Sequence, residues 1–227
     1  MSISVVIPTL NSAAHLPRSF APLTPAAMEG FIKEVIVADG GSTDETLAMA
    51  DAAGCEIVRA PAGRAKQFRA GVEIARANWL LLLHPDTALA PGWIEEAKGF
   101  LNQPMARKRA ATFTLALDDR SPAARRAVFW ARLRAKVMKL PYGEQGLLIS
   151  RLMYDGLGGY PDQPAMEDVE FARRIGSKRL VVLATEAVTS AEKYRRMGYD
   201  KRAWRNITLM ARYLMGADPV ELTKAYD

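Results

Sequence analysis

Short runs of aliphatic and β-branched residues recur through the first hundred residues of the chain, and each run ends in a polar or glycine-containing loop. The runs occupy residues 3–7 (ISVVI), 34–38 (EVIVA), 55–59 (CEIVR) and 79–83 (WLLLL). Near-continuous apolar runs of this length are typical of parallel strands that are covered on both faces. This feature therefore predicts an α/β fold with a doubly wound, mostly parallel sheet flanked by helices.

Helix-like segments separate these runs. Ser42 followed by Glu45 matches a capping box, so a helix is expected from there to Ala53, with Gly54 as its left-handed cap. Further helices are predicted over 64–77 and 91–101, the second opening at a proline. Ligands of such sheets bind at the carboxyl ends of the strands. The loops after the runs are therefore where a site is expected.

The pattern is less regular over residues 106–227. Strands are predicted at 110–117, 147–150 and 180–183, and helices at 122–140, 167–175 and 201–215, with a short helix after Asp218. No proline-, glycine- or serine-rich linker divides the chain. We therefore expect a single domain, 1–227, with a helical C-terminal segment.

Composition excludes several classes of protein. The 227 residues include 31 Lys and Arg against 25 Asp and Glu, and the net charge of +6 suits polyanionic partners without choosing among them. Cys55 is the single cysteine, which rules out an internal disulfide and a cysteine-rich zinc site. No nucleic-acid-binding signature is present, so no nucleic-acid partner is expected.

The apolar segments predict neither a signal peptide nor a membrane span. The first residues, MSISVVIPTLN, lack the basic and apolar regions of a secretory signal. The longest apolar run, 79–83, is too short to cross a bilayer. We expect a soluble cytoplasmic protein, and peripheral contact with the inner membrane face stays open as an alternative.

Two carboxylates follow predicted strands. Asp39 comes directly after the run 34–38, and Asp86 follows the run 79–83 in the sequence His84-Pro85-Asp86-Thr87. Carboxylates placed there can coordinate a hard divalent cation or accept hydrogen bonds from a nucleotide. Aspartate also serves turns and helix caps, but the recurrence on successive loops favours a site. An imidazole beside a carboxylate is compatible with Mn²⁺ or Mg²⁺.

Two further segments carry groups that suit catalysis. Gly63-Arg64-Ala65-Lys66-Gln67 places cations and backbone amides at a helix start, where a phosphate can be held, although a solvated basic face explains the same residues. Neither a Walker loop nor a Rossmann fingerprint occurs. Glu167-Asp168 opens a predicted helix after a glycine loop, which suits either a general base or stabilisation of the helix dipole.

These motifs together resemble the inverting family 2 glycosyltransferases, which have the GT-A fold. The segments that carry the resemblance are SVVIPTLN, EVIVADGGSTDET, GRAKQFRAG, LLLLHPDT, YGEQGLLISR and GGYPDQPAMEDVEFARRI, in this order over nearly the whole chain. The LHPDT, YGEQG and MEDVE set is most similar to a small bacterial branch described as radical-SAM/selenodomain-associated transferases. The resemblance implies a nucleotide-sugar-binding half over 1–105 and an acceptor-binding half over 106–227.

The family pattern implies roles for particular residues. The implied nucleotide-sugar site consists of Pro8, Thr9, Asn11, Asp39, Gly41, Arg64, Gln67, Asp86, Gly159, Tyr160 and Arg195. Arg195 stands for a basic residue that reaches the diphosphate from a C-terminal loop, for which Lys193 and Arg196 are also candidates. In the loop after residues 34–38, the second aspartate that is usual in the family is here Gly40. The first carboxylate of the family's metal motif is here His84. The resemblance implies that Asp86 and His84 hold Mn²⁺ or Mg²⁺.

The resemblance also implies a mechanism. Asp168, with Glu167 beside it, matches the catalytic base that takes a proton from the acceptor hydroxyl, and Tyr142, Glu144 and Gln145 lie on the acceptor side. One base without an enzyme nucleophile implies inversion at the anomeric carbon. The resemblance implies an enzyme similar to a hexosyltransferase. Its implied partners are a UDP- or GDP-sugar donor and an unknown acceptor, with a lipid-linked molecule among the acceptors to consider.

Two alternatives stay open. A nucleotidyltransferase acting on a sugar phosphate would share the α/β layout and the metal, but its glycine-rich, lysine-bearing signature is missing from the N-terminus. A non-catalytic, membrane-peripheral nucleotide-binding module would use the basic and apolar sides of the 122–140 helix at a membrane interface. The same helix packed on the core with solvated basic residues is the competing interpretation.

Overall fold

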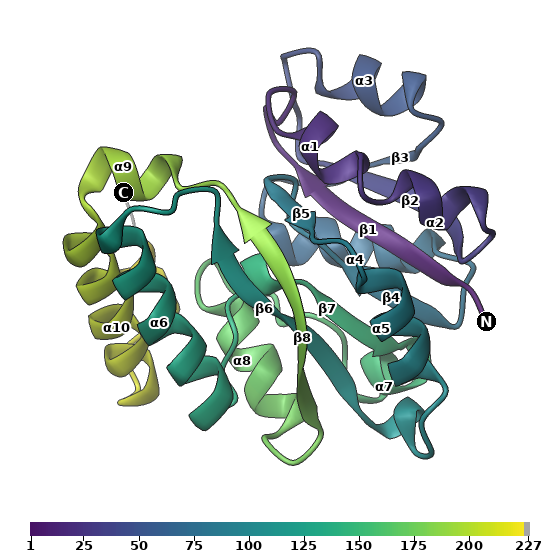
Figure 1. Ribbon diagram of the computed structural model, residues 1–227. Helices are drawn as coiled ribbons and strands as arrows, with labels where there is room; N and C mark the ends of the chain where they lie inside the picture. The colour runs from purple at the N-terminus through teal and green to yellow at the C-terminus, as the bar shows by residue number, and fades with distance from the viewer. Residues whose placement is uncertain (225–227) are drawn as a thin grey trace.

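The computed structural model describes residues 1–224, and its strands form one continuous sheet (Figure 1). The strands are β1 (Ile3–Thr9), β2 (Ile32–Asp39), β3 (Glu56–Arg59), β4 (Trp79–Leu82), β5 (Thr87–Leu89), β6 (Ala110–Leu117), β7 (Leu147–Ser150) and β8 (Leu180–Thr189). Their spatial order is β3-β2-β1-β4-β7-β6-β8-β5. The first four strands pair in parallel, β7 is antiparallel to both β4 and β6, and β6 and β8 are parallel. The α/β sheet expected from the sequence is confirmed.

Helices cover both faces of the sheet. They are α1 (Leu16–Phe20), α2 (Thr24–Met28), α3 (Thr46–Ala52), α4 (Arg64–Ile74), α5 (Trp93–Leu101), α6 (Pro122–Val137), α7 (Arg151–Gly156), α8 (Glu167–Ile175), α9 (Glu192–Met197), α10 (Tyr199–Leu214) and α11 (Pro219–Lys224). Two single-turn 3-10 helices are η1 (Ala106–Lys108) and η2 (Gly143–Gln145). None of the helices in residues 1–224 combines the length and apolar character of a membrane span.

Alternation within the strands explains why both faces are covered. In β1, Val5 and Ile7 enter a core formed with α1, α2 and α5, whereas Val6 enters a second core formed with α4, α7 and α8. Leu81 and Leu82 of β4 divide between the two cores in the same way. Because side chains alternate along a strand, an all-apolar strand must be covered on both sides. Burial on both faces therefore requires the helical layers seen in Figure 1.

The C-terminal helices form a separate layer beside β6 and β8. Leu140, Val169 and Leu209 join α8, α10 and the chain after α6 in one small core, while Ala127 and Tyr194 join α6 to α9 in another. Figure 1 shows α6 and α10 side by side at the end of the molecule away from β1, β2 and β3. The helices of this layer therefore form a surface that consists of residues from the second half of the chain.

Several local predictions were wrong. Five short elements, α1, α2, β5, α7 and α9, were not predicted, because three to six residues are too few to show a period. Ser42 does not cap α3, whose N-cap is Glu45; the Ser42 hydroxyl binds the Asp39 carboxylate instead. Helix α5 begins after Gly92 and not at Pro91. Strand β8 continues past 183 to Thr189 because its second part pairs with β5 and β6.

Candidate active site

The parallel strands bring the first predicted loops to one edge of the sheet. Thr9 at the end of β1 is paired in register with Asp39 at the end of β2, and β4 runs parallel to β1 on its other side. The loops that follow β1, β2 and β4 therefore leave the sheet at the same edge. This is the arrangement expected for Thr9, Asp39 and Asp86.

Asp39 organises the loop after β2. Its Oδ2 accepts hydrogen bonds from the backbone N–H groups of Gly41 and Ser42, both at 2.9 Å, and its Oδ1 accepts from Thr9 Oγ1 at 3.1 Å. The side chain is 1% exposed. Burial opposes ionisation, but the hydrogen bonds from Ser42, Gly41 and Thr9 outweigh it and lower the pKa of the carboxyl. Asp39 is therefore an ionised group that fixes the shape of the loop after β2.

Asn11 and Gln67 tie neighbouring loops together. The Asn11 backbone N–H donates to Ser42 Oγ at 2.8 Å, and its side-chain oxygen accepts from the Thr43 backbone N–H at 2.9 Å. The Gln67 amide donates to the carbonyls of Thr9 and Ala38 at 2.6 and 2.9 Å and is 3% exposed. In this structure Gln67 supports the ends of β1 and β2 from beneath, in place of the direct nucleotide contact that we expected.

The segment between β4 and β5 carries the predicted metal ligands. Asp86 is partly exposed, whereas His84 is 7% exposed and packs near the Phe68 ring, with 6.2 Å between ring centroids. Burial, followed by the positive charge of Arg64, lowers the pKa of His84 to about 4. The imidazole is therefore neutral at pH 7. Thr87 donates a hydrogen bond to the Glu144 carbonyl at 3.3 Å, which holds this segment against η2.

Arg64 and Glu167 join the two halves of the site. Arg64 Nε lies 2.8 Å from Glu167 Oε1, and the Glu167 side chain is 4% exposed. Glu167 Oε2 is buried and has no hydrogen-bond partner among residues 1–224. Burial raises the pKa of Glu167 to about 7, against the opposing effect of Arg64. A cavity of about 230 Å³ lies here, between the start of α4 and the loop that precedes α8.

Asp168 is held by the backbone of η2. Its Oδ2 accepts a hydrogen bond from the Gly143 N–H at 2.7 Å, and its Oδ1 accepts from the Val169 N–H at 2.8 Å. Gly143 also packs against His84, since a Cβ at this position would lie 2.7 Å from His84 Nε2. Gly143 therefore touches both the candidate base and the candidate metal segment, a contact that the sequence did not single out.

The three acceptor-side residues have different environments. Glu144 is partly exposed; burial of its carboxyl, followed by the charge of Asp86, raises its pKa. Tyr142 stacks with Arg134, whose guanidinium carbon is 3.5 Å from the ring centroid. Gln145 is fully buried, and its amide donates to the Phe113 carbonyl at 2.7 Å. Gln145 therefore supports η2. This structural role takes the place of the acceptor contact that we expected for Gln145.

Tyr160 and Gly159 belong to the core beneath the site. The Tyr160 ring stacks between Phe68 and Phe171, with centroid distances of 5.0 and 4.8 Å, and is 4% exposed. Gly159 has φ of +69°, and a Cβ there would lie 3.1 Å from Tyr154 Cε1. In this structure both residues are buried and position the loop before α8. Neither is an exposed group that could form the direct donor contact predicted for it.

The basic residues of α9 point to different places. Arg195 Nη1 lies 3.7 Å from Asp118 Oδ1 and 4.0 Å from Asp119 Oδ2, away from the predicted donor site. Lys193 instead contributes positive charge at His84 and at Glu144, where it opposes protonation of both groups and so favours a lower pKa. Of the α9 cations that the sequence offered as candidates, Lys193 therefore acts electrostatically on two of the predicted site residues.

Comparisons with known proteins identify the family of the chain. The sequence model described as glycosyl transferase family 2 matches residues 4–139. Proteins named PGL/p-HBAD biosynthesis glycosyltransferase, from Mycobacterium bovis and Mycobacterium tuberculosis, are 34% identical over 93 residues, which cover 38% of this chain and 36% of theirs. The match thus spans only about a third of the length of these relatives.

Solved structures share the fold at low sequence identity. TarS residues 1–349 from S. aureus has a TM-score of 0.65 and 14% identity, covering 98% of this chain and 68% of that one. Glucosyl-3-phosphoglycerate synthase from Mycobacterium tuberculosis, solved with Mn²⁺, UDP and glucosyl-3-phosphoglycerate, has a TM-score of 0.59 and 18% identity, covering 83% and 70% of the two chains. These likenesses confirm a fold of the GT-A type.

Proposed function

Because the chain belongs to glycosyl transferase family 2, we propose that it is a metal-dependent, inverting glycosyltransferase that moves a sugar from a UDP- or GDP-sugar to an acceptor hydroxyl. The observation that carries this proposal is the position of Asp168. Its carboxylate is fixed by the Gly143 N–H at 2.7 Å, on a loop that also packs against His84. A candidate base thus lies beside the segment that carries Asp86.

Asp168 is the proposed general base. Two backbone N–H groups, from Gly143 and Val169, orient its carboxylate. In the reaction the acceptor O–H gives its proton to Asp168, the acceptor oxygen bonds to the anomeric carbon, and the bond from that carbon to the diphosphate oxygen breaks. Attack from the face opposite the leaving group inverts the anomeric carbon. A positioned base of this kind contributes about 10²–10⁴-fold to the rate.

The donor diphosphate is proposed to lie between α4 and the β4–β5 segment. Arg64 lines the cavity at the start of α4, and both Arg64 and Lys193 place positive charge near His84, where they lower its pKa. Such preorganised charge stabilises a leaving group on which negative charge develops. Glu167 is 3% exposed and holds Arg64 in place through their ion pair. We therefore propose that Glu167 is a positioning residue, in place of the direct catalytic role that we expected for it.

The residues of the β4–β5 segment fit a divalent cation. Asp86 offers a partly exposed carboxylate, and His84 is neutral at pH 7, as an imidazole ligand must be. Residues 1–224 contain no cluster of three or more acidic, histidine or cysteine ligands, which agrees with ions that are held by one or two side chains and by substrate phosphates. Bound there, Mn²⁺ or Mg²⁺ would neutralise charge on the departing diphosphate.

The comparisons support the donor class and the cation. A structural neighbour was solved with Mn²⁺ and UDP, and TarS was solved with UDP-GlcNAc. We extend to this chain a donor half over 1–105 and an acceptor half over 106–227. A cytoplasmic location, with contact at the inner membrane face, belongs to the same proposal.

A donor screen tests the function. Thermal stability of the protein is measured with UDP- and GDP-sugars, with and without Mn²⁺, and positive donors are then assayed for release of the free nucleoside diphosphate. We expect stabilisation by one donor class only when Mn²⁺ is present, followed by slow hydrolysis of that donor. Release of pyrophosphate from a nucleoside triphosphate and a sugar phosphate would instead identify a nucleotidyltransferase. Absence of binding by any donor would contradict both.

A further inference from the structure

An apolar groove lies between α6 and α10, next to the proposed catalytic base. Its volume is about 350 Å³, within the range of small-molecule sites. Trp130, Leu133 and Val137 of α6 form one wall, and Ile207 and Met210 of α10 form the other. Trp130 and Val137 are 56% and 69% exposed, so the groove opens to the surface.

The inner end of the groove meets the active site at Tyr142. This residue lines the groove and also the small hollow that contains Gly143 and Asp168. Gly143 follows directly in the chain, and its N–H donates to Asp168 at 2.7 Å. A molecule lying in the groove therefore ends beside the residue proposed to accept the acceptor proton.

A buried cation lies at this inner end. Arg134 lines the groove and is 7% exposed. None of the ion pairs within residues 1–224 includes it. Its Nη1 donates to the Leu140 carbonyl and its plane stacks with Tyr142, whereas its Nη2 is buried without a hydrogen-bond partner. A buried guanidinium that lacks an anionic partner is costly unless another group completes it. Asn206 Oδ1, also at the groove, is buried and unpartnered as well.

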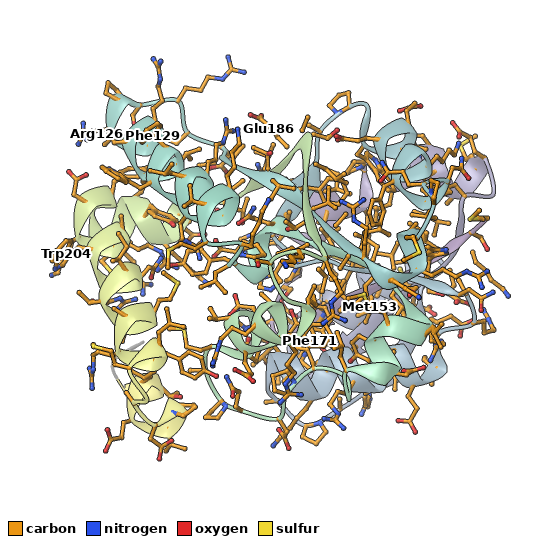
Figure 2. The ribbon with its side chains drawn as sticks, turned by 90° about the horizontal axis from the view of Figure 1, so that it is seen from below. Arg126, Phe129, Met153, Phe171, Glu186 and Trp204 are labelled. Carbon is orange, nitrogen blue, oxygen red and sulfur yellow. The ribbon has the colours of Figure 1, made fainter. Side chains whose placement is uncertain are left out.

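The helices around the groove carry a strong positive charge. Helix α6 contains five Arg and Lys residues and no acidic residue, and α10 contains four basic residues and one aspartate. Exposed apolar side chains gather on the same helices, and Figure 2 shows Phe129 and Trp204 at this end of the molecule, away from Phe171 in the core. An anionic amphiphile complements both features.

We propose that the groove binds the apolar chain of an amphiphilic acceptor, whose anionic head group meets Arg134 and whose hydroxyl reaches Asp168 past Tyr142. This assignment of an acceptor class rests on the proposed function. Its ligand chemistry is one hydrocarbon chain joined to a phosphate-type anion. The groove is distinct from the cavity at Arg64, so the two substrates of the reaction would approach the site from different sides.

Binding of decyl phosphate to the intact protein tests the site without requiring turnover. By calorimetry we expect decyl phosphate to bind at least tenfold more tightly than either inorganic phosphate or decyl maltoside. Ile207→Trp, which fills the groove, is expected to remove binding of the chain. Arg134→Met, which keeps an apolar stem in a buried position, is expected to abolish the preference for the anion.

Two controls make the result decisive. Phe129→Ser alters an exposed α6 residue that borders a different hollow and should leave the affinity unchanged. UDP binding should be the same in every variant. If the unaltered protein does not bind UDP, the proposed function is overturned, but binding of decyl phosphate still tests the groove. Equal affinity for decyl phosphate and decyl maltoside, or undiminished binding by Ile207→Trp, would overturn the inference. Equal loss in Ile207→Trp and Phe129→Ser would show surface adsorption in place of a groove.

Discussion

Arg64 at the first turn of α4 forms an ion pair with Glu167 at the first turn of α8, with 2.8 Å between Nε and Oε1. The pair links the loop proposed to hold the donor diphosphate to the helix that carries the proposed base. A diphosphate that attracts Arg64 would compete with Glu167 for the guanidinium. Donor binding and the environment of the base are therefore connected through one contact.

The buried Glu167 should make stability depend on pH. Its pKa rises from 4.5 to about 7 on folding, chiefly through burial, so the folded protein binds more protons than the unfolded chain between these values. Glu167 by itself lowers the free energy of unfolding as pH rises through this window, by at most about 1.4 kcal/mol per pH unit, and its effect levels off above pH 7. The buried His84, whose pKa falls from 6.5 to about 4 on folding, raises the free energy of unfolding between those values and so opposes Glu167 below pH 6.5. Urea denaturation from pH 5 to 8 measures this. Glu167→Gln should leave the opposing effect of His84 and so make stability rise with pH between 5 and 6.5 relative to the unaltered protein, whereas Glu73→Gln, on the exposed side of α4, should leave the profile unchanged.

Asp168→Asn should abolish transfer and spare donor binding. The amide keeps the size of the carboxyl but cannot take a proton, so we expect donor hydrolysis to fall by about 10²–10⁴-fold. The UDP dissociation constant, measured by calorimetry, should stay within about twofold. Asp155→Asn, an exposed change on α7, is the control. Turnover by Asp168→Asn at the unaltered rate would refute the assignment of the base.

Asp86→Ala should remove the effect of the divalent cation on donor binding. The unaltered protein should bind UDP more tightly in Mn²⁺ than in a chelator, because a cation held by Asp86 would offset the negative charge of the phosphates. In Asp86→Ala the two affinities should converge. Asp51→Ala, at an exposed position of α3, should retain the difference. A full Mn²⁺ effect in Asp86→Ala would place the cation elsewhere.

Gly143→Ala should damage both stability and activity. Its Cβ would lie 2.7 Å from His84 Nε2 and 3.6 Å from Asp168 Oδ2, so the loop or the imidazole must move. We expect a loss of about 1–3 kcal/mol in the free energy of unfolding, together with loss of transfer. Gly99→Ala lies in an open position of α5 and should stabilise the protein by up to about 1 kcal/mol. Chemical denaturation of both variants provides the comparison.

Lys193→Met and Arg195→Met separate the roles of two of the three cations of α9. Lys193 acts electrostatically on His84 and Glu144, so its loss should weaken UDP binding by about tenfold, or about 1.4 kcal/mol. Arg195 pairs with Asp118, so its loss should leave the UDP affinity unchanged. Calorimetric titration with UDP decides between them, and the reverse order would restore the role predicted for Arg195 from the sequence.

The periodic parts of the fold were predictable from the sequence. Strands buried on both faces, such as β1 and β4, read as unbroken apolar runs, and the strand order then places Asp39 and Asp86 at one edge. Short pairings such as β5 with β8 were not predictable, because a three-residue strand has no pattern of its own. Its partner lies about a hundred residues further along the chain.

Site residues were predicted with less success where burial decides their role. Three residues next to the proposed site are each less than 5% exposed, namely Gln67, Gln145 and Tyr160. Each of them supports the surrounding fold. A motif indicates that a residue is close to a site, but it does not indicate which way the side chain points. Arg134 was visible only as one of several basic residues on α6, since its burial depends on packing against Tyr142 and α10.

The position of β5 has a consequence for the order of folding during synthesis. Within residues 1–224, β5 pairs only with β8, and β8 is synthesised after the other strands of this part of the chain. Strands β1 to β4 can assemble early from nearby sequence, but β5, which follows His84 and Asp86, gains its strand pairing only when β8 inserts. Such distant pairing is slow to form. Nascent chains that stop before residue 180 should therefore have a folded loop after β2 while β5 is still unpaired.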